Sequence, residues 1–123
     1  MFTGHFDVVF FYRSPTTGFD DHYWELGGYF GRGAYFADDP NLSAGFVGAT
    51  NPRTMFVCSV LLGRQQDKSA TPLATPLAPT FYPDKGYDSV KGCVVFNGTQ
   101  REMEYVVYRY GQAKPRYMLR FDM

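Results

Sequence analysis

The sequence has no excess of charge of either sign. Its 123 residues contain 12 Lys and Arg and 12 Asp and Glu, so the formal net charge is +0, and no run of like charges disturbs this balance. A groove that holds nucleic acid needs a basic surface to neutralise the phosphates. Direct binding of nucleic acid is therefore not expected.

Long apolar runs are absent as well. None approaches the roughly 20 residues that a helix needs to span a bilayer. The short apolar stretch from Val8 to Tyr12 follows Asp7 rather than a basic segment, which is a poor match to a signal peptide. We expect an intracellular protein, nuclear or cytoplasmic, without a membrane partner.

Cysteine and histidine are scarce. The cysteines are Cys58 and Cys93, far apart in the sequence, and the histidines are His5 and His22. No C-x-x-C pair and no Cys/His spacing typical of a zinc site occurs. We therefore expect two buried free thiols in a reducing compartment, and no metal centre.

Familiar nucleotide and hydrolase motifs do not occur either. Gly31-Arg-Gly33 is a G-x-G, but a Rossmann fingerprint places a third glycine where this chain has Phe36. There is no Walker loop and no serine in a G-x-S-x-G turn. A chemical role must therefore come from another pattern.

Aromatic residues, in contrast, are abundant, with 12 Phe and 10 Tyr making up most of a 19% aromatic share. Two interpretations stay open. The rings fill a strand-rich core, since aromatic residues suit pleated surfaces, or some of them line a flat pocket for a planar ligand. The length indicates one domain over residues 1–123.

The order of apolar segments predicts an α+β fold with antiparallel sheet, four to six strands and little helix. Asp38-Asp39-Pro40 offers a helix start, and a short helix is expected from about Asn41 to Val47. Four prolines between Gly63 and Lys85 predict a surface loop with polyproline character, for which a docking ligand is the alternative. Strands are expected over residues 34–37, 54–62, 94–96, 104–110 and 117–121 with a turn over 112–115, while residues 8–12 fit a strand or a helix.

Several residues stand out as candidates for a binding site. Five glycines between Gly18 and Gly33 favour an ordered loop whose backbone approaches a ligand closely. Tyr35 and Phe46 then supply two aromatic faces, with Ser43 between them in sequence. Far downstream, Glu104 begins an apolar strand that can direct a carboxylate into a cleft. Taken singly, each residue also has an ordinary structural role, in the core, in a helix or at a strand end.

Together these residues resemble a known signature. The segment GFDDHYWELGGYFGRGAYFADDPNLSAGF, residues 18–46, is similar to the signature region of the poly(ADP-ribose) polymerase catalytic domain in its tankyrase-like form. EYVVYRYGQAKPRYMLRF, residues 104–121, resembles the last strands of that domain, and MFVCSVLLG and GYDSVKG match segments between them in order. The resemblance covers the C-terminal part of the domain. It implies the ADP-ribosyltransferase fold, which consists of split antiparallel sheets around an NAD cleft with few short helices.

The first strands and the helix of the family domain have no counterpart in this sequence. We therefore expect either an N-terminally truncated domain or one whose N-terminus has diverged. The family has a triad of a histidine, a tyrosine and a glutamate, and its histidine is followed by a glycine. Counting back from Gly18 without gaps brings Phe6 to the position of that histidine. A one-residue insertion brings His5 there, but Phe6 then stands where the family has the glycine that grips the carboxamide.

The resemblance implies a role for each candidate. Tyr35 would be the triad tyrosine that stacks on nicotinamide, and Glu104 the triad glutamate that binds the ribose 2′-hydroxyl and favours the oxocarbenium. Ser43 would bond the carboxamide, and Phe46 would supply a second stacking face. The donor loop over NAD would include Gly18, Tyr23 and Gly33.

The implied function is an NAD+ ADP-ribosyltransferase that modifies an acceptor protein or itself and releases nicotinamide without a metal. The sequence leaves mono- and poly-ADP-ribosylation open. Two alternatives also stay open: a degenerate module that binds NAD or ADP-ribose, and an interaction protein that uses the proline-rich loop.

Overall fold

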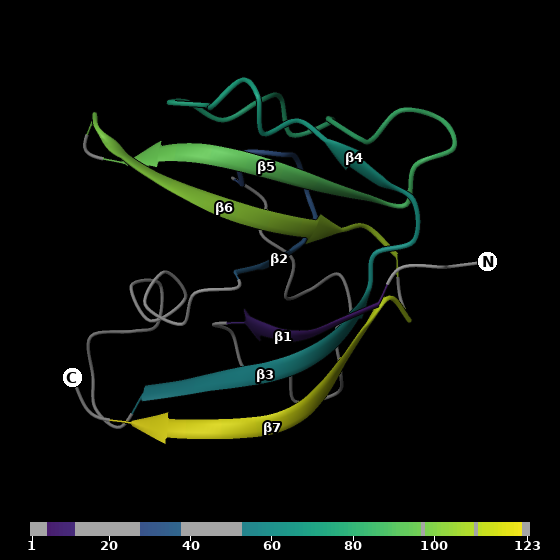
Figure 1. Ribbon diagram of the computed structural model, residues 1–123, viewed down its shortest axis with the longest axis vertical. Helices are drawn as coiled ribbons and strands as arrows, with labels where there is room; N and C mark the ends of the chain where they lie inside the picture. The colour runs from purple at the N-terminus through teal and green to yellow at the C-terminus, as the bar shows by residue number, and fades with distance from the viewer. Residues whose placement is uncertain (1–4, 12–27, 38–52, 97, 110, 122–123) are drawn as a thin grey trace.

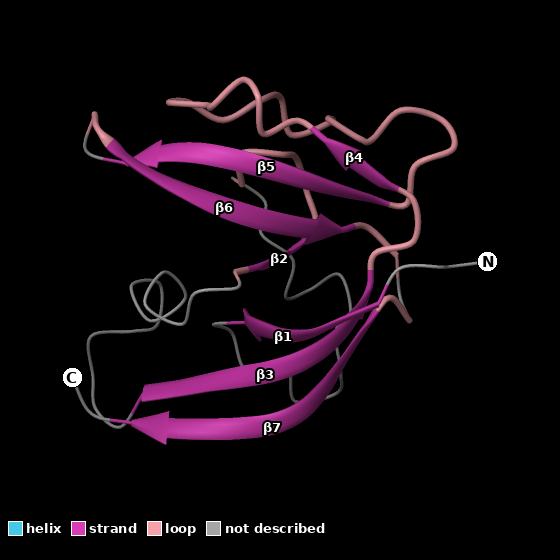
Figure 2. Cartoon of the chain, viewed as in Figure 1, coloured by secondary structure: helices cyan, strands magenta, loops and turns pink. Residues whose placement is uncertain are grey.

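A computed structural model describes residues 5–11, 28–37, 53–96, 98–109 and 111–121 of the chain. These residues form strands and loops and contain no helix (Figure 2). The strands are β1 (His5–Phe11), β2 (Ala34–Phe36), β3 (Arg53–Leu61), β4 (Gln65–Asp67), β5 (Ser89–Phe96), β6 (Gln100–Val107) and β7 (Ala113–Phe121). The expected strand-rich architecture with split sheets is confirmed, and the helix predicted over residues 41–47 lies outside the described residues.

The strands form two sheets that lie one above the other in Figure 1. One sheet has the order β1-β3-β7 and the other the order β2-β6-β5-β4. Every pairing is antiparallel except that of β4 with β5, which is parallel. The expectation of antiparallel sheet was therefore wrong at this one edge, where β4 lies inside the segment expected to be a loop.

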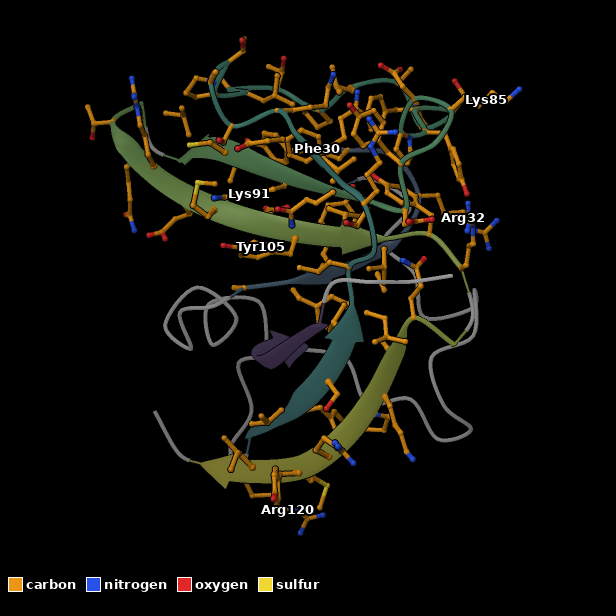
Figure 3. All side chains as sticks on the ribbon, turned by 45° about the vertical axis from the view of Figure 1, so that its right-hand side comes forward. Phe30, Arg32, Lys85, Lys91, Tyr105 and Arg120 are labelled. Carbon is orange, nitrogen blue, oxygen red and sulfur yellow. The ribbon has the colours of Figure 1, made fainter. Side chains whose placement is uncertain are left out.

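One apolar cluster joins the two sheets. It combines Phe36 of β2 and Tyr105 of β6 with Cys58 and Val60 of β3. Phe36 and Tyr105 are register partners, so their side chains share the face of the four-stranded sheet that is turned toward the other sheet. Figure 3 shows Tyr105 on this side of β6. Burial of these side chains holds the two sheets together.

A second cluster lies on the opposite face of the four-stranded sheet. Its fully buried members include Phe30, Val90 and Val106, and the proline-rich segment packs Leu73 and Leu77 against them. The Leu73 N–H donates to the Cys93 carbonyl at 2.9 Å, and the Leu73 carbonyl accepts from the Val95 N–H at 2.8 Å. The segment is thus a cover for this face, which argues against its use as a freely docking ligand.

The predicted strand positions were correct in order and displaced in their bounds. β3 begins and ends one residue before the expected 54–62, whereas β6 begins four residues before the expected 104. Residues 8–12, which fitted either element, belong mainly to strand β1.

The turn expected over residues 112–115 was wrong for its last three residues, because β7 already begins at Ala113 and includes Pro115. Proline is tolerated there because β3 is the one strand among the described residues with which β7 pairs, and because the register shifts between Val57 and Cys58, beside Pro115. Edge strands and bulges are the places in a sheet that accept a residue without an N–H.

Candidate active site

Tyr35 and Glu104 lie on two neighbouring strands in the four-stranded sheet. Tyr35 pairs with Val106, and Glu104 precedes Val106 by two residues on β6. Paired residues in antiparallel strands share a face, as do residues two apart. The tyrosine and the glutamate therefore point to the same face of the sheet, and each is only 7% exposed.

This face is the one turned away from the three-stranded sheet, because Tyr35 and Val106 belong to the second cluster. Continuing the β2–β6 register by one residue brings Ala37 beside Glu104. Residues 38–52, which contain Ser43 and Phe46, follow Ala37 directly and lie outside the described residues. Gly18 and Tyr23 also lie outside them, so the roles of these four residues stay predictions.

On its other side Glu104 pairs with Gly92 of β5. The missing side chain of Gly92 makes room for the ring of Phe30, which is 1% exposed. A Cβ at position 92 would lie 2.8 Å from Phe30 Cε1 and closer still to two further ring atoms. The Phe30 ring thus covers the sheet immediately beside the Glu104 carboxylate and lowers the local dielectric constant.

Two tyrosine hydroxyls hold the turn that carries Phe30. The Tyr35 hydroxyl accepts a hydrogen bond from the Phe30 N–H at 2.7 Å and donates to the Gly31 carbonyl. The Tyr108 hydroxyl donates to the Phe30 carbonyl at 2.7 Å. Gly31 has φ +80, which favours glycine, and a Cβ there would also collide with the Phe81 carbonyl. The turn is therefore held by the hydroxyls of Tyr35 and Tyr108 and by its close approach to the Phe81 carbonyl.

The same contacts fix the Tyr35 ring without any ligand. Its hydroxyl end lies against Gly28, where a Cβ would overlap the ring. A ring held at both its backbone and its hydroxyl has no rotamer freedom to lose on binding a planar partner.

Burial raises the pKa of Tyr108 far above its usual range, with smaller contributions from nearby Tyr82 and Glu104. The phenol therefore stays protonated over the pH range of ordinary experiments and keeps donating its hydrogen bond to the Phe30 carbonyl. The influence of Glu104 also agrees with the register, since residues 104, 106 and 108 share a face.

Fully buried Gln112 joins the end of this sheet to β3. Its side-chain amide donates to the carbonyls of Leu61 at 3.1 Å and Asp88 at 2.8 Å. Its carbonyl oxygen accepts from the N–H groups of Tyr108 at 3.2 Å and Arg109 at 3.0 Å. One side chain thus satisfies four backbone groups where the chain passes from one sheet to the other.

Gly33, which was expected to contact NAD, has an internal packing role. It is buried, and a Cβ there would meet the Val107 carbonyl at 2.8 Å and Val106 Cγ1 at 2.9 Å. The missing side chain therefore lets the loop approach β6. A contact of Gly33 with NAD stays a prediction.

His5 begins β1, where it pairs with Leu61, and its side chain lies outside the described residues. β1 is the strand of its sheet that comes closest to β2. The strands that carry His5, Tyr35 and Glu104 are therefore consecutive neighbours in the order β1, β2, β6. Three strands far apart in the sequence thus follow one another in space, while Tyr35 and Glu104 lie on the face turned away from the sheet that contains β1.

Sequence reasoning missed Phe30, Gly92, Tyr108 and Gln112. For Gly92 a signal existed, because a glycine inside the strand-like run SVKGCVVF indicates close approach of another group. Phe30 and Tyr108 look like ordinary core residues in the sequence. Their link through backbone hydrogen bonds appears only in three dimensions.

In the described part of the chain no group of three or more His, Cys, Asp or Glu side chains is arranged to hold a metal ion. Within the same residues, no helix has the length and apolar character needed to cross a membrane.

Comparison with known proteins gives the family. Residues 18–123 match the poly(ADP-ribose) polymerase catalytic domain. Human protein mono-ADP-ribosyltransferase PARP4 is 31% identical over 102 residues, which are 78% of this chain and 6% of the human protein. The chain thus spans a small part of that relative's length.

The family match covers far more than half of the chain, so the chain belongs to the poly(ADP-ribose) polymerase catalytic domain family. It is thereby a member of the ADP-ribosyltransferases, whose co-substrate is NAD. The match begins at residue 18, which is also where the resemblance in the sequence begins.

Proposed function

We propose that the chain transfers ADP-ribose from NAD+ to a protein side chain, or to itself, and releases nicotinamide. The single observation that supports this most strongly is the pair Tyr35 and Glu104. They point to one face of adjacent strands, buried beside a fixed aromatic wall. An aromatic platform next to a carboxylate is what cleavage of a nicotinamide glycoside needs.

Glu104 would act by charge. Breaking the bond between the ribose C1′ and nicotinamide develops positive charge on the ribose. A fixed carboxylate stabilises that charge best where water is scarce. Phe30, fully buried beside Glu104 and held by two tyrosine hydroxyls, keeps the surroundings of the carboxylate apolar. The acceptor side chain then attacks C1′ and loses its proton as the new glycosidic bond forms.

Tyr35 would hold the leaving group. Its ring is preorganised by hydrogen bonds to Phe30 and Gly31, so stacking costs little conformational entropy. Ser43 and Phe46 would complete the nicotinamide site from the segment that follows Ala37. Gly18, Tyr23 and Gly33 would contribute from the loop that precedes β2.

His5 would be the third triad member. It lies on the strand of its sheet that comes closest to β2. Because Phe6 stands where the family has glycine, we expect weaker grip on the carboxamide than in relatives with the His-Gly pair.

The test is automodification with labelled NAD+, read on a denaturing gel. Wild-type protein is expected to become labelled, and Glu104→Gln to lose the label. Glu102→Gln is the matched control, since Glu102 is a carboxylate two residues away on the same strand and bonds only to Gln100 in the described contacts. A labelled Glu104→Gln variant would contradict the proposal. A ladder of bands would indicate polymer, and a single shifted band would indicate single units.

The second candidate is binding without transfer. Phe6 in place of the glycine that follows the triad histidine is the feature that favours it. In that case the protein stays unlabelled, yet NAD+ raises its Tm, and Tyr35→Ala is expected to reduce this shift.

A further inference from the structure

The proline-rich segment, residues 68–83, does more than cover the four-stranded sheet, because it also holds the turn that carries Phe30. The Leu77 N–H donates a hydrogen bond to the Tyr29 carbonyl at 2.9 Å, and the Tyr29 hydroxyl donates to the Ala74 carbonyl at 3.5 Å. Figure 1 shows the segment running along β5 on the side away from the three-stranded sheet. The turn is therefore tied to this segment directly before Phe30.

Phe81, near the end of the same segment, contacts the turn with both its ring and its backbone. The rings of Phe81 and Phe30 meet edge to face, with centroids 6.2 Å apart and an interplanar angle of 66°. The Phe81 carbonyl lies so close to Gly31 that a Cβ there would collide with it. Phe81 is held in turn by other parts of the segment, because its N–H donates to the Ala78 carbonyl at 2.9 Å and Lys68 Nζ lies 5.7 Å from its ring centroid. The Phe81 ring is thus a fixed support for the Phe30 ring.

The Phe30 ring lies between this support and the strand that neighbours Glu104. On the strand side, the ring fills the space left by Gly92, which pairs with Glu104. Two tyrosine hydroxyls hold the Phe30 backbone, whereas Phe81 packs against the Phe30 ring itself. Removal of the Phe81 ring would therefore leave the turn in place and allow the Phe30 ring to move away from the carboxylate.

We propose that Phe81 is a positioning residue for ADP-ribosyl transfer, and this inference rests on the function proposed above. By holding the Phe30 ring against β5, Phe81 keeps water away from Glu104 while the ribose cation forms. The carboxylate then stabilises the cation more strongly, because charges interact more strongly where the dielectric constant is low. The same barrier favours the acceptor side chain over water as the nucleophile.

Two nucleophiles compete for C1′ of the ribose when its bond to nicotinamide breaks. In transfer, a protein side chain forms the new bond to C1′ and releases its proton. In hydrolysis, a water molecule forms that bond and releases a proton, which gives free ADP-ribose. Both reactions release one nicotinamide for each NAD+ consumed. The ratio of free to protein-bound ADP-ribose therefore reports on water at the site independently of the overall rate.

The test compares the wild-type chain with Phe81→Ala, using NAD+ that is labelled in its adenine ring. Nicotinamide release gives kcat and KM, and separation of protein from solution gives bound and free ADP-ribose. We expect Phe81→Ala to lower kcat about tenfold while KM changes by less than about threefold, because the ring affects the reacting centre rather than binding. The ratio of free to bound ADP-ribose is expected to rise at least about threefold as water gains access.

Two further variants separate this role from a general loss of stability. Val60→Ala is the control, because Val60 is fully buried in the first apolar cluster, on the opposite face of the four-stranded sheet. It is expected to lower the Tm, as Phe81→Ala does, without changing the ratio of free to bound ADP-ribose. Phe81→Leu keeps part of the apolar volume and is expected to give a ratio between those of wild type and Phe81→Ala. A ratio above that of wild type in Phe81→Leu carries the test where Phe81→Ala does not fold.

The outcomes distinguish the inference from the function on which it rests. A wild-type chain that releases no nicotinamide would contradict the proposed function, and the inference with it. Release by the wild type, with the same kcat and the same ratio in the Phe81 variants, would overturn the role of Phe81 alone. An equal rise of the ratio in Val60→Ala would also overturn it, since lost stability would then explain the effect.

Discussion

Adding a single methyl group at Gly92 is expected to destabilise the sheet beside Glu104. A Cβ there would lie 2.8 Å from Phe30 Cε1 and closer to Cζ and Cε2, whereas carbon atoms in contact prefer about 3.5–4.0 Å. The ring must therefore move by at least about 1.5 Å. It has little freedom to do so, since it is 1% exposed and its backbone is held by Tyr35 and Tyr108.

The expected cost follows from these contacts. Overpacking a tight site costs about 1–3 kcal/mol, and the rigid turn puts Gly92→Ala in the upper half of that range, at about 2–3 kcal/mol. Urea unfolding followed by tryptophan fluorescence or circular dichroism measures it as a lower midpoint with an unchanged slope.

A second substitution tests the cause. Phe30→Leu alone leaves a cavity and is expected to cost about 1–2 kcal/mol. Combined with Gly92→Ala, the smaller side chain makes room for the methyl group, so the double variant is expected to be at least about 1 kcal/mol more stable than the sum predicts. Additive losses of stability in the double variant would refute the conclusion that the missing side chain of Gly92 makes room for the Phe30 ring. So would a Gly92→Ala variant whose free energy of unfolding is within about 0.5 kcal/mol of wild type.

Three further predictions concern groups that the structure shows to be buried. Tyr35→Phe leaves the Phe30 N–H and Gly31 carbonyl without the hydroxyl and is expected to lower the free energy of unfolding by about 1–3 kcal/mol, while Tyr117→Phe, at an exposed ring, changes it by less than about 0.5 kcal/mol. Gln112→Met keeps the side-chain volume but removes the hydrogen bonds to four backbone groups, so urea denaturation is expected to show a loss of about 3 kcal/mol or more in the free energy of unfolding. A near-neutral variant would show that water replaces the amide. Burial raises the pKa of Cys58 from 9.0 to about 12, so its thiol is expected to resist a thiol reagent at pH 8 and to react once the protein is unfolded. Because the thiolate is disfavoured in the folded state, this contribution to stability is complete below about pH 9 and is lost as the pH rises toward 12; rapid labelling of Cys58 in the native protein would contradict the burial.

The order of all strands except β4 could be predicted from the sequence because apolar and β-branched runs mark them. β3 was located within one residue since its run of apolar residues is long and bounded on both sides. β4, with the sequence QQD, could not be found, because it has no apolar pattern and owes its form to pairing with β5. The early start of β7 was missed because Pro115 normally signals a turn, and only the edge position and the bulge make it acceptable.

For the candidate site, Tyr35 and Glu104 could be selected in the sequence through the family resemblance, and their shared face follows from the register of β2 and β6. The surroundings of the site could not be predicted. The hydroxyl of Tyr35 acts on the backbone of its own preceding turn, and Phe30 fills the space above Gly92. Such contacts depend on how a loop folds back over a sheet, which no local pattern encodes.

The most direct test of the central claim is the rate of nicotinamide release from NAD+ by wild-type protein, Glu104→Gln and Glu102→Gln, together with the affinity of each for NAD+. The account predicts that Glu104→Gln lowers kcat by roughly 100-fold or more with nearly unchanged affinity, because the carboxylate acts on charge that develops only in the transition state. Glu102→Gln is expected to behave like wild type. Equal rates for Glu104→Gln and wild type would contradict the claim that Glu104 stabilises the ribose cation.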